Sequence, residues 1–312
     1  MKTSECYLPE GSYTALPEVR QALSSPDGLR RAQDEGMILE AVAQRCTASH
    51  DLLFDFGFAQ GIMPRSCCAL GVAEGDTREI AILSRVGKPT CFAVTEVDET
   101  SDPPVVWLSR TIVQQRAQDF FLDTLTPGDV IPAAVTHLEP FGAFVDIGCG
   151  VASLIGIENL SVSRIFHPSD RLSVGQSIYA AVRSVDPVAR RISLTHRELL
   201  GTWEQNTAQF SPGETVRGVV RSVEPYGVFI ELAPNLSGLA EPRSDLAAGT
   251  VVSVYIKSIL PQRMKIKLTV IDVLAPSEAP PLPQYFITEG HIDEWVYTPA
   301  CCDRKYIATV FE

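Results

Sequence analysis

The chain has 312 residues, 26 lysines and arginines against 38 aspartates and glutamates, a formal charge of −12 and 45% hydrophobic residues. This composition is typical of a folded protein and excludes a disordered chain, and the length predicts two or three domains. No apolar run reaches the roughly 18 residues of a membrane span, and the stretch MKTSECYLPEG has no apolar h-region of the kind that a secretory signal carries. We therefore expect a soluble cytoplasmic protein with no membrane contact.

The eight cysteines form no metal-binding or disulfide pattern. Two adjacent pairs occur, at Cys67 and Cys68 and at Cys301 and Cys302, but there is no CxxC and no histidine at ligand spacing. In the expected compartment these are reduced thiols. No P-loop, GxSxG, HExxH or paired-carboxylate pattern stands out, so we predict a non-enzyme without catalytic residues, metal or cofactor.

The first part of the chain is predicted to be an extension followed by a degenerate domain. Residues 1–35 form the extension, with some helix between Pro17 and Gln33. Residues 36–110 are a weak copy of a repeat found twice more downstream: Asp55 and its neighbours resemble later positions, and the segment ends in WLSR. Residues 111–125 contain neither Gly nor a Pro and predict a linker helix.

Two stronger copies follow at residues 126–200 and 211–274. The stretch TPGDVIPAAVTHLEPFGAFVDIG from Thr126 aligns without gaps with SPGETVRGVVRSVEPYGVFIELA from Ser211. Residues 201–210 are the linker between the two copies. Such self-similarity indicates two examples of one domain.

Each strong copy alternates polar and apolar residues between Gly and Pro. The strands expected in the middle copy are Val130–Glu139, Ala143–Ile147, Val151–Ile157, Ser177–Asp186 and Arg191–Thr195. Five short strands in about 70 residues fit a Greek-key barrel of the oligonucleotide/oligosaccharide-binding (OB) kind, whereas a sandwich usually needs more strands. We predict an all-β protein with linker helices and three tandem OB-folds, the first degenerate.

The C-terminal part, residues 275–312, is a Pro-rich linker and a tail. The linker is APSEAPPLP, from Ala275 to Pro283, and the following QYFITEGHIDEWVYTP matches no repeat. Its aromatic residues predict that the tail docks on something, with its own chain as one option.

Alternation predicts that one Phe in each strong copy points away from the barrel core. Phe144 shares its face with Asp146 and not with Val145, and Phe229 shares its face with Glu231. A Phe of the core would instead lie with the aliphatic residues. We therefore expect Phe144 and Phe229 on the outer surface.

A second ring precedes each of these strands. Phe141 comes before Gly142, and Tyr226 comes before Gly227. The two glycines are expected to permit a bulge that re-aims the preceding ring. Each copy would then carry a platform of two rings.

The last two strands of each copy place further rings and cations on the outer face. By parity these are Tyr179, Arg183 and Arg191 in the middle copy and Tyr255, Lys257, Lys265 and Lys267 in the third. Exposed rings beside cations suit a single strand of nucleic acid, because bases stack on rings and phosphates meet Lys or Arg.

These residues resemble an RNA-binding domain named after the first protein of the bacterial small ribosomal subunit, the S-one domain. The motif is a Gly before the first strand, then FGAFV and an acidic residue, and later VD with a basic residue before ISLT. The whole arrangement is similar to the short S-one homologues of Gram-positive anaerobes. The resemblance implies binding of single-stranded RNA, often messenger RNA at the ribosome. By position, the residues implied are Phe141, Phe144, Asp186 and Arg190 or Arg191 in the middle copy, and Tyr226, Phe229 and Lys265 in the third.

The sequence departs from the family pattern at several positions. The third-strand His of many S-one domains is Gly156 in the middle copy and Glu241 in the third, and the third copy has Leu260 where the middle copy has Asp186. Weaker or differently selective sites are expected there.

The first copy lacks the two rings of the platform. Its aromatic positions fall near His50 and Leu53. We expect this domain to contact protein, with the small (30S) ribosomal subunit as the partner, and the domain string to be a monomer.

The acidic charge lies mostly outside the two strong copies. Residues 126–200 hold six Lys and Arg against seven Asp and Glu, and residues 211–274 hold seven against six. Phosphate contacts usually dominate nucleic-acid affinity, so we expect modest affinity carried by stacking. Two rivals stay open: an acidic adaptor that binds protein on the ribosome or another RNA machine, and an enzyme whose tail or Cys301 and Cys302 do chemistry.

Overall fold

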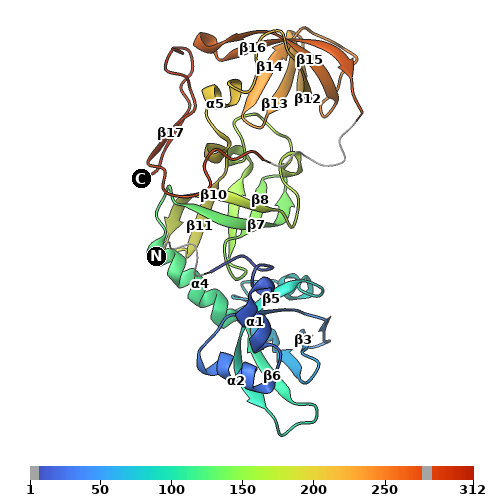
Figure 1. Cartoon of the computed structure of the whole chain (residues 1–312), viewed down its shortest axis with the longest axis vertical. Helices are drawn as coiled ribbons and strands as arrows, with labels where there is room; N and C mark the ends of the chain where they lie inside the picture. The colour runs from blue at the N-terminus through green and yellow to red at the C-terminus, as the bar shows by residue number, and fades with distance from the viewer. Residues whose placement is uncertain (1–6, 276–282) are drawn as a thin grey trace. The chain divides into compact units, whose positions relative to one another are not determined.

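The computed structural model describes residues 7–275 and 283–312, which divide into two compact units (Figure 1). Cys6 and most of the predicted Pro-rich linker lie outside the described residues. The N-terminal unit takes in the chain up to Thr124 with residues 132–134 and 146–152, and the C-terminal unit holds residues 125–131, 135–145 and 153–312. Within the part of the chain that is described, no helix combines the length and apolar character needed to cross a membrane.

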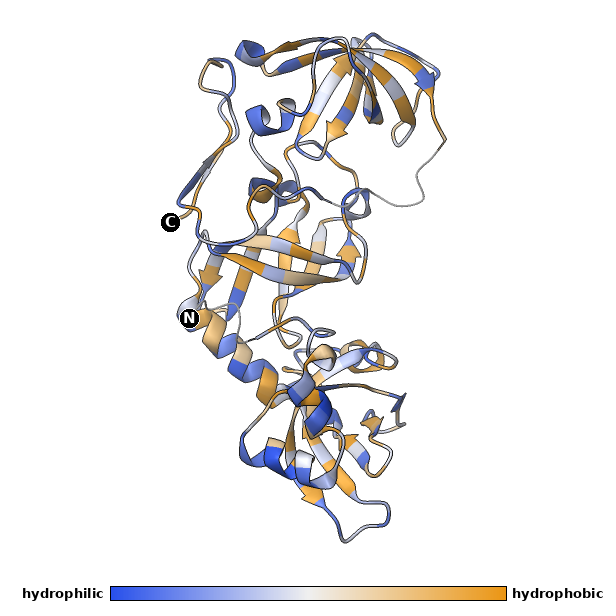
Figure 2. Ribbon diagram, viewed as in Figure 1, coloured by the Kyte–Doolittle hydropathy of each residue, from blue (hydrophilic) through white to orange (hydrophobic). Residues whose placement is uncertain are grey.

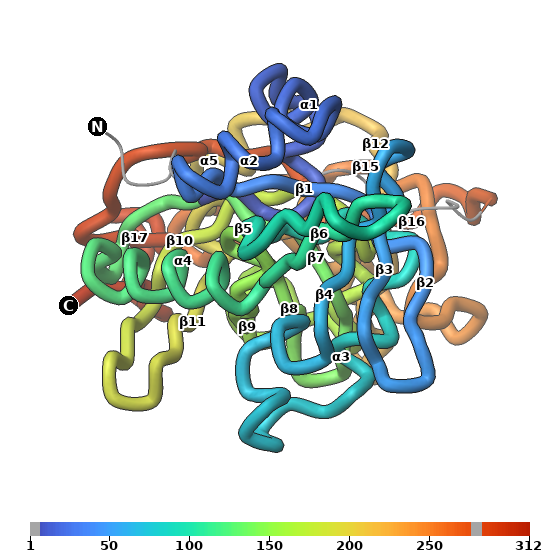
Figure 3. Tube along the Cα trace, turned by 90° about the horizontal axis from the view of Figure 1, so that it is seen from below, coloured from blue at the N-terminus to red at the C-terminus, as the bar shows by residue number. Residues whose placement is uncertain are grey.

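The N-terminal unit begins with two short helices, α1 (Pro17–Ala22) and α2 (Pro26–Asp34). Each starts with proline, whose fixed φ suits the first helical position and whose missing N–H is not needed there. Ser25 caps α2 by accepting a hydrogen bond from the Gly28 N–H at 3.1 Å. The two helices lie where the sequence predicts helix, and Figure 3 shows α2 beside β5 (Pro89–Asp98), against which it packs.

A six-stranded sheet completes the N-terminal unit, in the order β1-β5-β6-β4-β3-β2. Its strands are β1 (Leu39–Val42), β2 (Arg45–Cys46), β3 (Leu52–Asp55), β4 (Gln60–Met63), β5 and β6 (Val105–Ser109), with α3 (Ile80–Leu83) between β4 and β5 and α4 (Arg110–Thr124) after β6. The first and last strands in this order, β1 and β2, follow each other in the chain. If β1 and β2 are counted as one interrupted strand, the strands pair in the order of a closed five-stranded barrel.

The two later copies each form a closed five-stranded barrel. The middle barrel has the order β10-β11-β9-β8-β7, from β7 (Val130–Glu139), β8 (Gly142–Asp146), β9 (Ala152–Gly156), β10 (Ser177–Asp186) and β11 (Arg191–Thr195). The third barrel has the order β12-β13-β14-β16-β15, from β12 (Thr215–Glu224), β13 (Gly227–Ala233), β14 (Leu236–Ala240), β15 (Val251–Leu260) and β16 (Lys265–Val273). The predicted fold, tandem OB-type domains with a degenerate first copy, is confirmed.

Alternating burial along each strand fills the barrels. On β13, Val228 and Ile230 are fully buried and Phe229 between them is only half-buried. Figure 2 shows the alternation of hydropathy along the strands. Gly227 at the start of β13 allows a close approach to β14, because a Cβ there would lie 2.6 Å from the Ala240 carbonyl oxygen. The period-two pattern therefore specifies the core of the barrel, and a glycine allows this close contact between two strands.

The C-terminal tail folds onto its own unit. Its hairpin joins β17 (Glu294–Val296) to β18 (Ala308–Val310), and Trp295 and Tyr297 are buried in the hydrophobic cluster of the third barrel. The short helix α5 (Trp203–Thr207) in the predicted linker adds Trp203 to the same cluster. Docking of the tail on its own chain, one of the options left open by the sequence, is what the structure has.

The buried His196 anchors the start of the tail through a hydrogen bond with Tyr285. His196 Nδ1 donates to the Leu160 carbonyl at 3.1 Å, which leaves Nε2, 2.9 Å from the Tyr285 hydroxyl, to accept a hydrogen bond. Burial lowers the pKa of His196 to about 4. The imidazole is therefore neutral near pH 7, as this hydrogen-bond arrangement requires.

Candidate nucleic-acid interface

The middle barrel carries a pair of accessible rings at the tight turn between β7 and β8. Phe141, in the turn, is 56% exposed, and Phe144 on β8 is half-buried. Their ring centroids lie 5.9 Å apart with planes at 88°. His137 on β7 extends this surface, with its ring 6.5 Å from that of Phe144. His137 was not among the predicted site residues, although its position just before the FGAF motif is a signal for it.

The third barrel repeats the pair with nearly the same geometry. Tyr226 is 66% exposed, and its ring centroid lies 6.2 Å from that of Phe229 with planes at 87°. The β12–β13 register runs without a shift from Ser222 to the Glu224–Gly227 pair, so Tyr226 lies in a two-residue hairpin turn. The predicted bulge at Gly227 is therefore wrong, because the turn itself is what exposes the ring.

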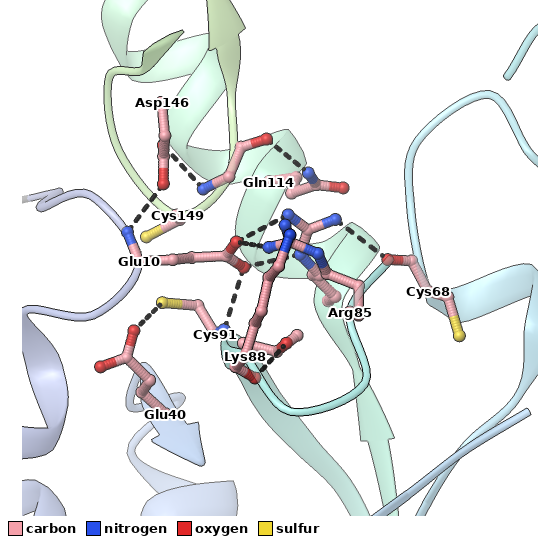
Figure 4. A network of polar contacts seen from close by, with 12 residues as sticks. Glu10, Glu40, Cys68, Arg85, Lys88, Cys91, Gln114, Asp146 and Cys149 are labelled. Carbon is pink, nitrogen blue, oxygen red and sulfur yellow. Dashed lines mark hydrogen bonds and ion pairs between the residues drawn. The ribbon is translucent and has the colours of Figure 1, made fainter. Parts of the chain in front are cut away.

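The carboxylates that share a face with the two Phe residues are buried. Asp146 accepts hydrogen bonds from the backbone N–H groups of Glu10 at 2.7 Å, Gly148 at 2.8 Å and Gly150 at 2.9 Å. Figure 4 shows the bond between Asp146 and Glu10. Glu231 pairs with Arg171 and with Arg221, whose Nε lies 2.9 Å away. The predicted outward parity was correct, but the two acids are buried, because segments outside the barrel strands, which carry Glu10 and Arg171, cover them.

The strand register places Phe229 in a row of paired residues that runs across neighbouring strands of the third barrel. Phe229 pairs with Ser222 on β12 and with Leu239 on β14, and Leu239 in turn pairs with Lys267 on β16. Paired neighbours in a sheet share a face. Lys267 therefore lies on the same face as the ring, and Lys265, two residues earlier, shares that face.

A groove with a volume of 630 Å³ opens over this platform. Tyr226, Phe229 and Lys265 line it together, so the structure brings these three predicted residues to one site. Lys267, Lys257 and Tyr255 are not among its lining residues. Lys257 instead pairs with Glu241, with its Nζ 2.8 Å from Glu241 Oε1. Glu241 is the residue at the position where many S-one domains have a histidine.

The other predicted residues of the middle barrel are more scattered. Arg183 donates to Asn159 Oδ1 at 2.9 Å, and Asp186 Oδ1 accepts from the Ala189 N–H at 2.8 Å within the β10–β11 turn. Arg191 pairs with Asp186 in the strand register, and Arg190 lies in the turn with a positive φ of 52°. The turn therefore brings Asp186 and both arginines to one end of the barrel.

Tyr179 is the predicted residue most changed by the tail. Its ring meets that of Tyr285 edge to face at 5.4 Å, and its backbone N–H donates to the Tyr285 hydroxyl at 3.3 Å. The prediction placed the Tyr179 ring on an exposed outer surface. In the structure, the tail segment that carries Tyr285 covers one side of this ring.

Comparison with known proteins agrees with this geometry. The family model described as the S1 RNA binding domain, which is the S-one domain, matches residues 124–197. Small ribosomal subunit protein bS1 of Staphylococcus haemolyticus is 30% identical over 276 residues, covering 83% of this chain and 68% of the relative. The bS1 protein of Staphylococcus saprophyticus is 32% identical over 276 residues, covering 83% and 67%.

Solved structures give a looser likeness. A multidomain protein with nucleic acid binding domains from Streptococcus pneumoniae is 13% identical, covers 76% of this chain and 73% of its own, and has a TM-score of 0.26. A score that low has no bearing on how the domains are arranged. The extent and identity of the bS1 matches decide the assignment: this chain belongs to the family of small ribosomal subunit protein bS1.

Proposed function

We propose that the protein binds single-stranded RNA, messenger RNA above all, and acts in translation on the small ribosomal subunit in the cytoplasm. The observation that carries this is the repetition of one ring pair, with matching centroid distances and near-perpendicular planes, at the same hairpin turn of two closed barrels. The exposed rings leave apolar surface in contact with water, and a planar ligand stacked on them would cover that surface. Bases stack on such rings with little sequence preference.

We assign the RNA sites by the contacts of each residue. In the third barrel, Tyr226 and Phe229 stack bases while Lys265 and Lys267 meet phosphates. In the middle barrel, Phe141 and Phe144 stack bases, with Asp186, Arg190 and Arg191 near the strand ends. The residues with a peripheral role in this proposal are Tyr179, Arg183, Tyr255 and Lys257. The boundaries 36–110, 126–200 and 211–274 remain our proposed domains, joined by 111–125 and 201–210.

The test is fluorescence anisotropy of the full chain with a labelled single-stranded RNA of about 20 nucleotides and with the same sequence as a duplex. We expect the single strand to bind at least tenfold more tightly, since paired bases cannot stack on the rings. The plot of log K against log salt should have a slope no steeper than about −3, because each phosphate contact to a single strand contributes about −0.7. Equal binding to duplex, or no RNA binding at all, would favour the protein-binding adaptor instead.

We also propose that the N-terminal domain holds the protein, as a monomer, on the small ribosomal subunit. At the ring positions of the other copies it has His50, whose Nδ1 lies 3.0 Å from Glu79 Oε2, and the half-buried Leu53. It does expose Ile80, 64% accessible, and Leu83 on α3. Exposed apolar neighbours of this kind suit a protein contact.

Substituting both apolar residues, Ile80→Glu with Leu83→Glu, should lower the fraction of the protein that co-sediments with purified small subunits at least fivefold. Val188→Glu in the middle barrel is the matched control, because Val188 is almost fully exposed and lies outside the N-terminal domain. Unchanged co-sedimentation of the double variant would contradict attachment through this surface.

A further inference from the structure

The third-barrel groove has walls that do not belong to the third barrel. Besides the platform rings, it is lined by Arg164 from the β9–β10 connection of the middle copy and by Lys305 from the loop of the C-terminal hairpin. Neither segment belongs to the third copy, residues 211–274. With Trp203 of α5, the groove is therefore assembled from four separate stretches of the chain.

The charge of this lining contrasts with the charge of the molecule. Five cations line the groove against a single carboxylate, Glu224, in a chain whose formal charge is −12; the cations are Arg164, Arg221, Arg263, Lys265 and Lys305. Arg221 is committed to Glu231 and Asp170. Over residues 7–275 and 283–312, no carboxylate lies within salt-bridge distance of the other four. A concentration of free cations around two rings is the surface that a nucleic-acid backbone needs.

The β9–β10 segment is fixed at the edge of the groove. The Val162 N–H donates to Asn235 Oδ1 at 2.8 Å, and the Ser163 and Ser237 hydroxyls lie 2.9 Å apart. The Arg164 guanidinium lies 5.7 Å from the ring centroid of Phe166. These contacts hold Arg164 beside the groove before any ligand arrives, so little ordering entropy is lost on binding.

The C-terminal hairpin is fixed equally firmly. Tyr297, at the end of β17, donates its buried hydroxyl to the Asn235 carbonyl, and its own carbonyl accepts from the Trp203 N–H at 3.1 Å. Across the hairpin, the Thr309 hydroxyl donates to Glu198 Oε1 at 2.7 Å. The loop that carries Lys305 is thus held between two anchored strands.

We propose that the C-terminal hairpin and the β9–β10 connection are parts of the RNA site: Arg164 and Lys305 bind phosphates of a strand whose bases stack on Tyr226 and Phe229. This inference rests on the proposed function and adds a phosphate-binding wall from outside the third barrel. It gives the tail a role in holding RNA and predicts that the third barrel without this hairpin binds RNA more weakly than the full chain.

The test compares neighbouring charge reversals in the full chain, Lys305→Glu and Arg304→Glu. Both residues are exposed and both changes alter net charge equally, but Arg304 does not line the groove. With a labelled single-stranded RNA of about 20 nucleotides, Lys305→Glu should raise Kd at least fivefold and make the salt slope shallower by about 0.7. Arg304→Glu should change Kd less than twofold, and Arg164→Glu should behave like Lys305→Glu.

A second comparison separates a local contact from a long-range charge effect. In a Tyr226→Ala, Phe229→Ala background, where the strand is no longer held in the groove, Lys305→Glu should change Kd less than twofold. Equal effects of Lys305→Glu and Arg304→Glu, or the same effect of Lys305→Glu in both backgrounds, would overturn the inference while leaving the proposed function intact. Absence of RNA binding by the unmodified chain would instead refute the proposed function itself.

Discussion

Replacing all four platform rings by alanine, at Phe141, Phe144, Tyr226 and Phe229, is expected to weaken single-stranded RNA binding at least 100-fold. Each stacked base contributes about 1–3 kcal/mol, and 1.4 kcal/mol corresponds to a factor of ten in affinity. Each ring pair removed alone should cost at least tenfold, because the two barrels present the same pair geometry. The measurement is fluorescence anisotropy at fixed salt, since affinity for RNA changes with salt.

The controls separate loss of stacking from loss of fold. Phe141 and Tyr226 lie in exposed turns, so Phe141→Leu with Tyr226→Leu removes two π-faces while keeping an apolar side chain at each turn. Val188→Ala, at an exposed position of the β10–β11 turn, should leave Kd unchanged. Circular dichroism should show all variants folded. Native affinity in a folded four-ring variant would refute the platforms as the RNA site.

The substitution Glu10→Gln is expected to destabilise the N-terminal unit by about 3–5 kcal/mol, because it leaves a buried guanidinium without its counter-charge. Arg110 donates to Glu10 through Nε at 2.7 Å and through Nη2 at 2.9 Å, and Arg85 donates through Nη1 at 2.5 Å. The side chains of Glu10 and Arg110 are only 6% and 7% exposed. Burial raises the pKa of the Glu10 carboxyl, but Arg110 and Arg85 outweigh it and hold the pKa below its usual value.

Hydrogen exchange followed by mass spectrometry, in increasing urea, would measure this loss in peptides of the N-terminal unit. Glu18→Gln on the exposed face of α1 is the matched control and should change stability by less than 0.5 kcal/mol, about the usual limit for surface sites. A loss below about 1 kcal/mol for Glu10→Gln would show that the two arginines are stabilised by other groups. Peptides from the third barrel should be unaffected, because it lies in the other unit.

Local pattern was enough to predict the barrels and the platforms. Strand limits in the middle barrel follow from period-two alternation: Val130–Glu139, Ser177–Asp186 and Arg191–Thr195 are the predicted ranges and the observed ones. The parity argument also placed Phe144 and Phe229 away from the core. Both results depend on interactions between residues that are close in sequence. Each of the two strong copies contains this pattern, so the two copies support the same prediction.

Features that need distant segments could not be predicted in this way. The burial of Asp146 and Glu231 could not be predicted, because alternation describes only the two sides of a strand and says nothing of the segments that cover the outer side. Glu10 lies in an extension with no periodic pattern, and its partner Arg110 is 100 residues away in the chain. Tyr179 had outward parity, yet the tail brings Tyr285 against it.

The sequence by itself therefore determined the repeat, the barrel and the paired rings, because periodicity and motif spacing are local properties of the chain. Only the tertiary structure decided which charged side chains form ion pairs and which do not. Arg221 and Lys265 both line the groove of the third barrel, but Arg221 is paired with Glu231 and Lys265 has no carboxylate partner in the described chain. Ion pairing depends on distances between segments far apart in sequence, and folding alone sets those distances.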